Sequence, residues 1–551
     1  MTFKFSVPHR NKPDSWHILD MDTNERVVVE LKDPLFDGDL FSVSPQGTIT
    51  ILESPVRSRA IPAVLALEGS KTYGRDKKTN KLLYKCIPDD VRLPAFLVPY
   101  EVKHVGFSKV FSNMYVTMQF DHWVDKHPRA KLDSVLGPVD DVDCFYEYQL
   151  SCKGLNISIQ KFQKEVHKAN QPLFPLGIED RTNRHVITID PPQTLDYDDA
   201  FGFDETTGVL SVYIANVALC IDALQLWSVF SRRVATIYLP DKKRPMLPTI
   251  LSDGICSLQQ KQERMVLAMD VQLADGEIKD IRFATARIQV SRNYVYEENA
   301  LLADPAYLHT LSIARRLSPT TIQDSHDVVS YLMVMMNHQC ALKLAQHQTG
   351  IFRSSNLREK VDLDETCLPK DVAKSIQLWK GASAQYTANV TARHELLEID
   401  SYVHITSPIR RLVDLLNMIQ FQNIVCGTPL LSEKASTFYS NWVQELAYIN
   451  ATMRAIRKVQ ADCFLLSMCC CAEERENEKE YEGYLFDKQE RSDQQYQYTV
   501  FLPALKLYTY VTIALNVDNY TKRKCAVYLF HDEERLKRKI RVNILPLTTS
   551  A

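Results

Sequence analysis

Four aspartates crowd into a ten-residue segment of the sequence: Asp190, Asp196, Asp198 and Asp199. The apolar residues 185–189 before them have the pattern of a β-strand, and Pro191 and Pro192 would end it, leaving the last three acids in a turn or loop. Carboxylates this close repel one another unless cations lie between them. Hard oxygen ligands suit Mg²⁺, which usually shares its coordination shell with substrate phosphate. By spacing alone, an acidic surface turn or a single Ca²⁺ site explains the segment equally well.

The composition limits the classes of protein to which the chain can belong. It has 551 residues, 45% of them hydrophobic and 24% charged, which is enough for three or four globular domains. With a net charge of −3, binding to nucleic acid would depend on local basic surfaces. Only 16 glycines are present, and none forms a glycine-rich phosphate loop or a dinucleotide fingerprint, which argues against a nucleotide cofactor.

The sequence indicates neither a signal peptide nor a membrane span. Residues 1–6 lack an apolar core of signal-peptide length, and no later segment is apolar for long enough to cross a bilayer. The 13 cysteines include no Cys-x-x-Cys pair, and those at 469–471 lie in a helical pattern that points them in different directions. We therefore expect an intracellular, cytoplasmic protein with reduced thiols and no membrane association.

Hydrophobic periodicity predicts the elements around the acidic segment. Residues 1–60 and 62–123 carry short alternating strands with turn signals between them, which is typical of small β-barrels. A strand at residues 209–217 is expected to pair with the strand that leads into the acidic segment. A helix over residues 325–345 is apolar on most faces and should be buried.

Further helices and a final β-rich region follow. A helix is expected to begin near Ser407 and Pro408, with the serine as N-cap, and a long helical stretch to run from 433 to about 480. Residues 482–551 return to a β pattern, which favours a small barrel that binds single-stranded RNA. An ordinary solvated surface would have the same composition. The basic clusters and tyrosines of this region are residues 522–524 and 535–541, with Tyr508, Tyr510, Tyr520 and Tyr528.

Three motifs together resemble the ribonuclease II and ribonuclease R family, the RNB-type exoribonucleases. The acidic segment has the family's spacing of apolar strand, Asp, five residues and Asp-x-Asp-Asp-Ala, ending here at Ala200. Residues 402–414 are close to the family's Tyr-x-His-x-Thr-Ser-Pro-Ile-Arg-Arg-Tyr-x-Asp, and residues 238–258 resemble its Met-Leu-Pro, Leu-Ser and Cys-Ser-Leu run. Residues 87–94 resemble the second cold-shock-like domain of the eukaryotic exosome-type members, so the chain looks like a divergent member closer to that branch.

The resemblance implies a multidomain α+β fold, with a central RNB catalytic domain, cold-shock-like OB barrels before it and an OB-like β-barrel after it. The expected boundaries are 1–60 and 61–135 for the two N-terminal barrels, 136–180 for a connecting segment, 181–480 for the RNB domain with its C-terminal helices, and 481–551 for the OB-like RNA-binding domain.

The activity that the resemblance implies is hydrolysis of single-stranded RNA from its 3′ end to 5′-monophosphates, with Mg²⁺ as cofactor and Mn²⁺ as an alternative. Phosphodiester hydrolysis needs an activated water, a stabilised leaving oxygen and neutralised phosphate charge, which two metal ions about 3.5–4 Å apart can supply. We expect Asp190, Asp196 and Asp199 chiefly to anchor the ions and Asp198 to be the most rate-critical carboxylate. Subunits of an RNA-decay complex are further expected partners.

Other site residues are implied by the same motifs. Arg410 matches the family arginine that contacts the scissile phosphate, where a fixed guanidinium fork would stabilise the charge of the transition state. Tyr238 and Tyr296 match tyrosines near the substrate end, and stacking on a ring is worth about 1–3 kcal/mol per base regardless of base identity. The remaining RNA-binding residues that we expect are Arg353, Ser407 and Arg411.

The chain departs from the family pattern at several positions around the site. Asn216 stands where the family has an aspartate, and Ser330-Tyr331 replaces paired glutamates. These changes support an alternative hypothesis, a catalytically impaired RNB-fold protein that binds RNA as a regulator or complex subunit. A third hypothesis is a structural protein that binds Ca²⁺ or Mg²⁺ and no nucleic acid. The other departures are Arg353-Ser354-Ser355, Leu412 and Met418-Ile419.

Overall fold

A computed structural model of the chain divides into two compact units. The first comprises Met1–Asn156, Leu239–Asp241 and Lys458–Ala551, and the second comprises Ile157–Tyr238 and Lys242–Arg457. In the described part of the chain, no helix is both long and apolar enough to cross a membrane. The structure describes residues 2–8, 10–31, 33–102, 111–169, 174–175, 177–274, 276–355, 368–380, 384–425, 431–470, 479–491 and 494–546.

The first unit contains three β-structures in the residues that the structure describes. Phe41 is fully buried in the core of the N-terminal sheet, and Phe96 in that of the closed barrel that follows. The N-terminal sheet has the order β3-β2-β1-β4-β5, with bounds Arg26–Val27, His17–Asp20, Phe3–Ser6, Leu40–Val43 and Ile49–Glu53. The closed barrel has the order β10-β8-β7-β6-β9, with bounds Arg129–Pro138, Phe96–Tyr100, Leu82–Pro88, Ile61–Leu65 and Met114–His122.

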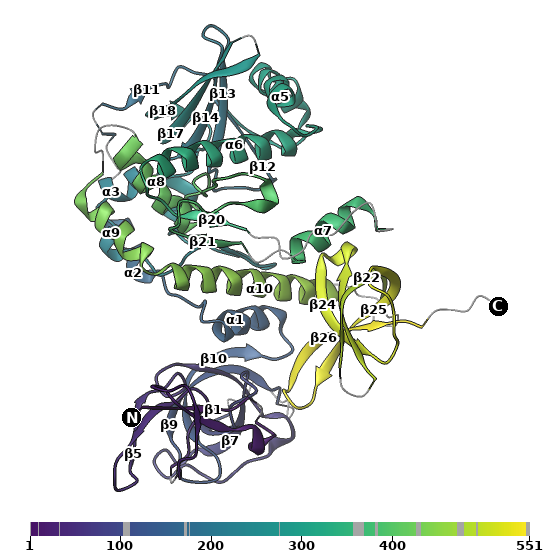
Figure 1. Ribbon diagram of the computed structural model, residues 1–551. Coiled ribbons are helices and arrows are strands. Elements are labelled where there is room, and N and C mark those ends of the chain that lie inside the picture. The colour runs from purple at the N-terminus through teal and green to yellow at the C-terminus, as the bar shows by residue number, and fades with distance from the viewer. Residues whose placement is uncertain are drawn as a thin grey trace, which may run out of the picture. The chain divides into compact units, whose positions relative to one another are not determined.

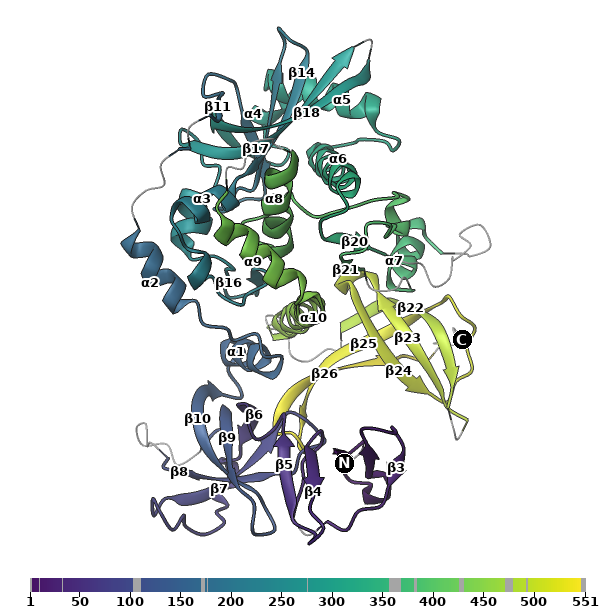
Figure 2. The same cartoon turned by 60° about the vertical axis from the view of Figure 1, so that its left-hand side comes forward.

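The third β-structure is a strongly curved sheet near the C-terminus, drawn in yellow in Figure 2. Its order is β24-β23-β22-β25-β26, and the bounds are Leu507–Ile513, Tyr496–Leu502, Lys479–Glu490, Thr521–Asp532 and Lys537–Ile544. These closed and curved β-structures, together with the mixed unit below, confirm the predicted α+β fold class. One helix, α1 (Val142–Cys152), packs on strands β9, β10 and β6 of the closed barrel.

The second unit is built on a mixed sheet, in which the described residues form seven strands. The order is β11-β18-β17-β14-β13-β12-β19, with bounds Glu179–Asp180, Glu277–Gln289, Glu263–Ala274, Val209–Ala215, Asp199–Asp204, Ile187–Asp190 and Arg292–Val295. Its central strands are rich in β-branched and aromatic residues and are almost entirely buried, as at Val212 and Tyr213. Asp190 is the last residue of β12 and Asp199 is the first residue of β13. Both therefore lie at the same edge of the sheet, the one formed by the ends of these strands.

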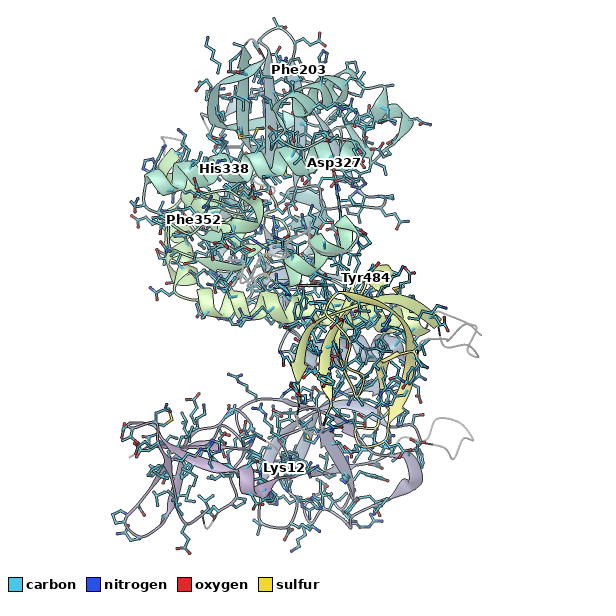
Figure 3. The ribbon with its side chains drawn as sticks, turned by 45° about the vertical axis from the view of Figure 1, so that its right-hand side comes forward. Lys12, Phe203, Asp327, His338, Phe352 and Tyr484 are labelled. Atoms are coloured by element: carbon cyan, nitrogen blue, oxygen red, sulfur yellow. The ribbon has the colours of Figure 1, made fainter. Side chains whose placement is uncertain are left out.

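Helices pack against this sheet and hold the loops at that edge. Asp304 and Asp324 accept hydrogen bonds from the first-turn backbone N–H groups of α5 and α6 and so define where these helices begin. Figure 1 shows α5 and α6 beside the sheet, and Figure 3 labels Asp327 and His338 on α6. The helices of this unit are α2 (Gln160–Lys168), α3 (Val217–Ala223), α4 (Asn299–Leu302), α5 (Pro305–Leu317), α6 (Ser325–Gln346), α7 (Lys370–Lys380), α8 (Leu412–Val425), α9 (Glu433–Val443) and the first part of α10 (Leu446–Cys470).

Two short two-stranded sheets complete the surroundings of the acidic segment. β15 (Ile237–Tyr238) pairs with β16 (Lys243–Arg244), and Tyr238 lies opposite Lys243 in the register. β20 (Phe352–Ser354) pairs with β21 (Gln385–Thr387). As predicted, the helix over 325–345 exists and is largely buried, as α6.

Three predictions of local structure were wrong. The strand at 209–217 pairs with β13 and β17 instead of β12, because the acidic loop turns the chain back and places β13 between β12 and β14. The helix expected at Ser407 begins at Leu412, because Thr236 and Val234 engage the backbone of Arg410 and Leu412. The long helical stretch is interrupted after Val443, and β22 begins at Lys479; residues 471–478 lie outside the described part.

Candidate functional site

A cavity of about 510 Å³ lies at the edge of the sheet where the acidic segment is found. It brings together nine of the ten predicted site residues, which come from distant parts of the sequence. The tenth, Arg353, does not line it. The lining residues are Ile189, Asp190, Pro191, Thr194, Asp196, Asp198, Asp199, Tyr238, Tyr296, Val329, Ser330, Met333, Val334, Asn337, Tyr402, His404, Thr406, Ser407, Arg410 and Arg411.

The two aspartates at the strand ends lie in similar, buried surroundings. Asp190 Oδ2 and Asp199 Oδ2 are buried, and neither has a hydrogen-bond partner among the described residues. Burial, together with the neighbouring charges of Asp199 and Asp198, raises the pKa of Asp190 to about 8. Burial also raises the pKa of Asp199 to about 6, against the opposing effect of Arg410. Two carboxylates with free buried oxygens are the donor set that a cation would satisfy.

Asp198 is buried and has protein partners at both carboxylate oxygens. Oδ1 accepts the backbone N–H of Ile409 at 2.9 Å, and Oδ2 lies 3.3 Å from Arg410 Nε. Burial raises the pKa of Asp198 to about 8 even though both partners favour the charged form. The backbone carbonyl of Asp198 accepts the N–H of Ala215 at 2.8 Å, which ties the acidic loop to β14. Asp198 therefore links the acidic loop to the segment that carries the arginines.

Asp196 is engaged by a lysine. Lys243 Nζ lies 2.8 Å from Asp196 Oδ1 and 2.9 Å from Asp253 Oδ1. Burial by itself would lower the pKa of Lys243, but its hydrogen bonds to both carboxylates raise it, so the ammonium is charged at neutral pH. Tyr238 Oη donates to Asp196 Oδ2 at 3.4 Å. Asp253 belongs to a one-turn π-helix, Ile250–Ile255, and also accepts a hydrogen bond from the hydroxyl of Ser252.

Arg410 and Arg411 are adjacent in sequence but differ in exposure and partners. Arg410 keeps 44% of its side chain exposed at the cavity and donates from Nη2 to Ser407 Oγ at 2.9 Å. Arg411 is more buried, and its Nη2 lies 2.8 Å from Asp414 Oδ1. Asp414 also accepts the backbone N–H of Ser407, so this carboxylate organises the turn. Arg410 is therefore the arginine that a phosphate in the cavity can reach, whereas Arg411 supports the turn.

Two buried amides hold the loop at residues 401–411 in place. Asn337, on α6, accepts the backbone N–H of Ile405 and donates to the Tyr402 hydroxyl at 3.0 Å. Asn417, on α8, donates to the backbone carbonyl of His404 at 2.9 Å and exchanges hydrogen bonds with the backbone of Ile351. A buried amide that satisfies loop backbone groups fixes the loop rigidly, because leaving such groups unpaired is costly.

The two predicted stacking tyrosines contact different members of the acidic segment. Tyr238 is 43% exposed, and its hydroxyl contacts Asp196. Tyr296 follows β19, donates its backbone N–H to the Asp190 carbonyl at 3.3 Å, and stacks on His326 with ring centroids 3.7 Å apart and an interplanar angle of 10°. One face of the Tyr296 ring is thus already covered by protein, so a base would stack on the other face.

The departures from the family pattern occupy four kinds of environment. Asn216 caps α3 and exchanges hydrogen bonds with the amide of Gln422, so it is structural and does not line the cavity. Ser330 lines the cavity directly. Leu412, Met418 and Ile419 are fully buried in the core around α8. Arg353 lies on β20 with its guanidinium 6.0 Å from the Tyr386 ring.

Sequence reasoning missed Lys243, Asp253 and Asn337. Lys243 carried a signal, because the basic residues 242–244 interrupt the otherwise apolar motif between Tyr238 and Pro245. The role of Asn337 depends on contacts with residues more than 60 positions away, which no local pattern reveals.

The basic clusters of the curved C-terminal sheet are largely paired with acids of the same unit. Lys522 and Lys524 lie 2.7 and 2.8 Å from carboxylates on β22, and Arg538 lies 3.3 Å from Asp140. Lys537 pairs with Asp89. RNA binding by this sheet stays a prediction.

The donor set of the cavity fits a divalent cation in part. Among the described residues, no three Asp, Glu, His or Cys side chains converge as a ready-made metal site. The free oxygens of Asp190 and Asp199 nevertheless provide two carboxylates at one place. Mg²⁺ is commonly held by one or two carboxylates, with water and substrate phosphate completing its octahedron. The residues present therefore suit an ion that is completed by substrate.

Comparisons with known proteins assign a domain family to the part of the chain that builds the cavity. Residues 178–310 and 302–427 match the RNB domain family. Ribonuclease R of Helicobacter pylori is 25% identical over 372 residues, which cover 53% of this chain and 58% of that protein. The chain thus matches less than two thirds of the length of this curated relative.

Two solved structures share the fold. Mycoplasma genitalium RNase R in complex with ribose-methylated single-stranded RNA superposes with a TM-score of 0.69 at 17% identity, covering 98% of this chain and 100% of that one. Yeast Ssd1, a pseudonuclease, superposes with a TM-score of 0.61 at 16% identity, covering 91% of this chain and 70% of that one.

The RNB match covers the strands, helices and loops that build the cavity. Residues 178–427 of the chain therefore match the RNB domain family, as the three motifs predicted. This region is divergent, because Asn216 and Ser330-Tyr331 stand where the family pattern has acidic residues.

Proposed function

We propose that this protein is a divalent-metal-dependent exoribonuclease that hydrolyses single-stranded RNA from the 3′ end and releases 5′-monophosphates. The observation that carries the proposal is the pair of unpartnered buried oxygens on Asp190 and Asp199, in a cavity that Arg410 also lines. The match to the RNB domain family and the similarity to ribonuclease R support it.

Asp190 and Asp199 would hold the divalent cation, either Mg²⁺ or Mn²⁺. Such a cation supplies Lewis acidity, which activates water for attack and neutralises phosphate charge. Arg410 binds a phosphate oxygen through the part of its guanidinium that faces the cavity, and Asp198 and Ser407 fix the orientation of that guanidinium. The sequence predicts a second ion with Asp196 as a further anchor, but the proposal requires only the ion at Asp190 and Asp199, because Lys243 already binds the carboxylate of Asp196.

The aromatic residues define how the RNA end lies. Tyr238 and Tyr296 both line the cavity and offer ring faces for bases. Stacking of this kind does not depend on base identity, which suits an enzyme that removes nucleotides one after another. A cavity of about 510 Å³ lies within the size range of small-ligand sites, which suits the terminal nucleotide of a strand.

A degradation assay tests the proposal. The full chain is incubated with 5′-labelled single-stranded RNA in Mg²⁺, in Mn²⁺ and in EDTA. We expect progressive shortening from the 3′ end with either metal, nucleoside 5′-monophosphates as products, and no shortening in EDTA. Intact RNA in both metals would refute the proposal.

A catalytically impaired RNA-binding protein is the second candidate. It is favoured by Asp196 and Asp198, whose charges are already met by Lys243 and Arg410, and by Ser330 at the cavity wall. The similarity in fold to the pseudonuclease Ssd1 is consistent with it. This candidate predicts RNA binding without metal-dependent shortening in the same assay. Association with subunits of an RNA-decay complex stays a prediction.

A further inference from the structure

The four aspartates of the acidic segment divide by the cations around them. Asp198 lies beside Arg410, and Asp196 lies beside Lys243. Asp190 and Asp199 each have a buried oxygen with no hydrogen-bond partner among the described residues. The protein thus places a cationic side chain in direct contact with two of the acids. Arg410 acts on the other two only through its longer-range charge, so their buried oxygens are left to a cation from solution.

Lys243 is placed to hold Asp196 by three independent features. The β15–β16 hairpin sets Lys243 opposite Tyr238, and the hydroxyl of Tyr238 contacts the other oxygen of Asp196. Asp253 binds the same ammonium from the opposite side at 2.9 Å. Asp253 is held in turn by the hydroxyl of Ser252 at 2.6 Å. Two carboxylates on one half-buried ammonium form a compact arrangement whose charges balance better than those of Asp190 and Asp199.

We propose that Lys243 takes the place of a second metal ion at Asp196, so that this chain binds one divalent ion, at Asp190 and Asp199, instead of two. An ammonium is a point charge with three donors and can satisfy carboxylate oxygens that would otherwise coordinate a metal. The inference rests on the proposed function only in taking Asp190 and Asp199 as the metal ligands. Lys243 is thereby a positioning residue, because it acts through Asp196.

The stoichiometry of Mn²⁺ binding tests this inference without RNA. The full chain is dialysed against Mn²⁺, and the bound ion is counted from the electron paramagnetic resonance signal of free Mn²⁺. We expect one tight site per chain in the wild type and two in Lys243→Met, in which the carboxylates of Asp196 and Asp253 lose their ammonium. The matched control is Lys242→Met, which removes an exposed lysine from the same hairpin and should leave one site.

Further variants keep the test decisive if Lys243→Met unfolds, which thermal melting would reveal. Lys243→Arg keeps a cation and should retain one site. The double variant Asp196→Asn/Lys243→Met removes the carboxylate with the lysine and should return the count from two to one. Two sites in the wild type, or one site in folded Lys243→Met, would overturn the inference, as would the absence of any bound ion.

The outcomes also separate this inference from the proposed function. A wild type with one Mn²⁺ that leaves RNA intact would refute the exonuclease proposal and retain the role of Lys243. If the wild type degrades RNA and binds two ions, the exonuclease proposal is retained and the role of Lys243 is refuted.

Discussion

The two aspartates at the strand ends and the two in the loop between them have different surroundings. Asp190 and Asp199 lie at the ends of strands of the sheet, and each has a buried oxygen without a hydrogen-bond partner in the described part of the chain. Asp196 and Asp198 lie in the connecting loop, and each is bound by a cationic side chain. Because strands position side chains rigidly whereas a loop adapts to its neighbours, the strand ends can hold charge in an unfavourable place. The difference teaches that equal residue types in one motif need not have equal roles.

The largest effect is expected from Asp198→Asn, because this side chain couples the loop to Arg410. The amide can still accept from the Ile409 N–H, but it loses the charge that orients the guanidinium. We expect the rate of RNA degradation to fall by about 10²–10³, as for loss of one preorganised catalytic group. A gel assay measures the rate, and fluorescence anisotropy should show that RNA binding survives.

The control for Asp198→Asn is Asp125→Asn, which changes an exposed aspartate of the other unit. Degradation by Asp198→Asn at the rate of this control would remove Asp198 from the mechanism.

A smaller loss of activity is expected from Arg410→Ala, and a different kind of effect from Arg411→Ala. Arg410 is 44% exposed, so its removal should lower the degradation rate by about tenfold to a hundredfold. It should destabilise the protein less than Arg411→Ala does, because water can enter the space that the exposed guanidinium leaves beside Asp198. Arg411→Ala leaves Asp414 buried without its cation and should cost about 3–5 kcal/mol of stability. Thermal melting and the gel assay separate the two. Equal destabilisation by both variants would contradict the division of roles.

The comparison between strand ends and loop also predicts a pH dependence of stability. The folded-state pKa of Asp190, about 8, exceeds the unfolded value of about 3.9, so the folded protein binds more protons between these pH values. In the absence of metal, its contribution to stability therefore falls as pH rises through this window. Asp190→Asn removes that loss and should melt about 2–4 °C above the wild type at pH 8, the shift that about 1 kcal/mol produces.

The same pair of proteins supplies the control for this pH dependence. At pH 5 the two melting temperatures should approach each other, since Asp190 is then protonated in the folded wild type. Mn²⁺ at pH 8 should raise the melting temperature of the wild type more than that of the variant. A variant that is less stable than the metal-free wild type at pH 8 would show that Asp190 is satisfied within the protein.

The smallest effects are expected from the two tyrosines that line the cavity. Tyr296→Ala should weaken binding of single-stranded RNA about tenfold, within the range for losing one stacked base, and Tyr296→Phe should retain affinity. Tyr238→Phe should keep stacking and lose only the hydrogen bond to Asp196. Anisotropy titrations in EDTA measure these affinities without turnover. If Tyr296→Ala binds single-stranded RNA as tightly as the wild type, the ring of Tyr296 serves only to pack on His326.

Much of the site was predictable, because its motifs are local in sequence. The spacing that ends at Ala200 indicated the acids, and residues 402–414 indicated Arg410 and Ser407, all of which line the cavity. The buried helix at 325–345 followed from its apolar faces. The pairing partner of the strand at 209–217 did not follow, because strand order depends on how the acidic loop turns.

The start of α8 shows why a local signal can fail. Ser407-Pro408 is a strong helix-start signal, but the following backbone is engaged by residues 234–236 from a distant part of the chain. Tertiary hydrogen bonds of this kind override a capping preference worth about 1 kcal/mol. Arg353 does not line the cavity for a related reason, since its strand β20 pairs with β21, a strand that lies beyond helix α7 in the sequence.

The sequence by itself determined which residue types the site contains and how the acids are spaced, because these are covalent properties of the chain. The tertiary structure alone decided which carboxylates receive a protein cation. Lys243 lies 47 residues from Asp196, and Arg410 lies 212 residues from Asp198, so folding must bring each pair together. The electrostatic state of an acid depends on its burial and on the charges that folding places beside it, and neither is encoded in local spacing.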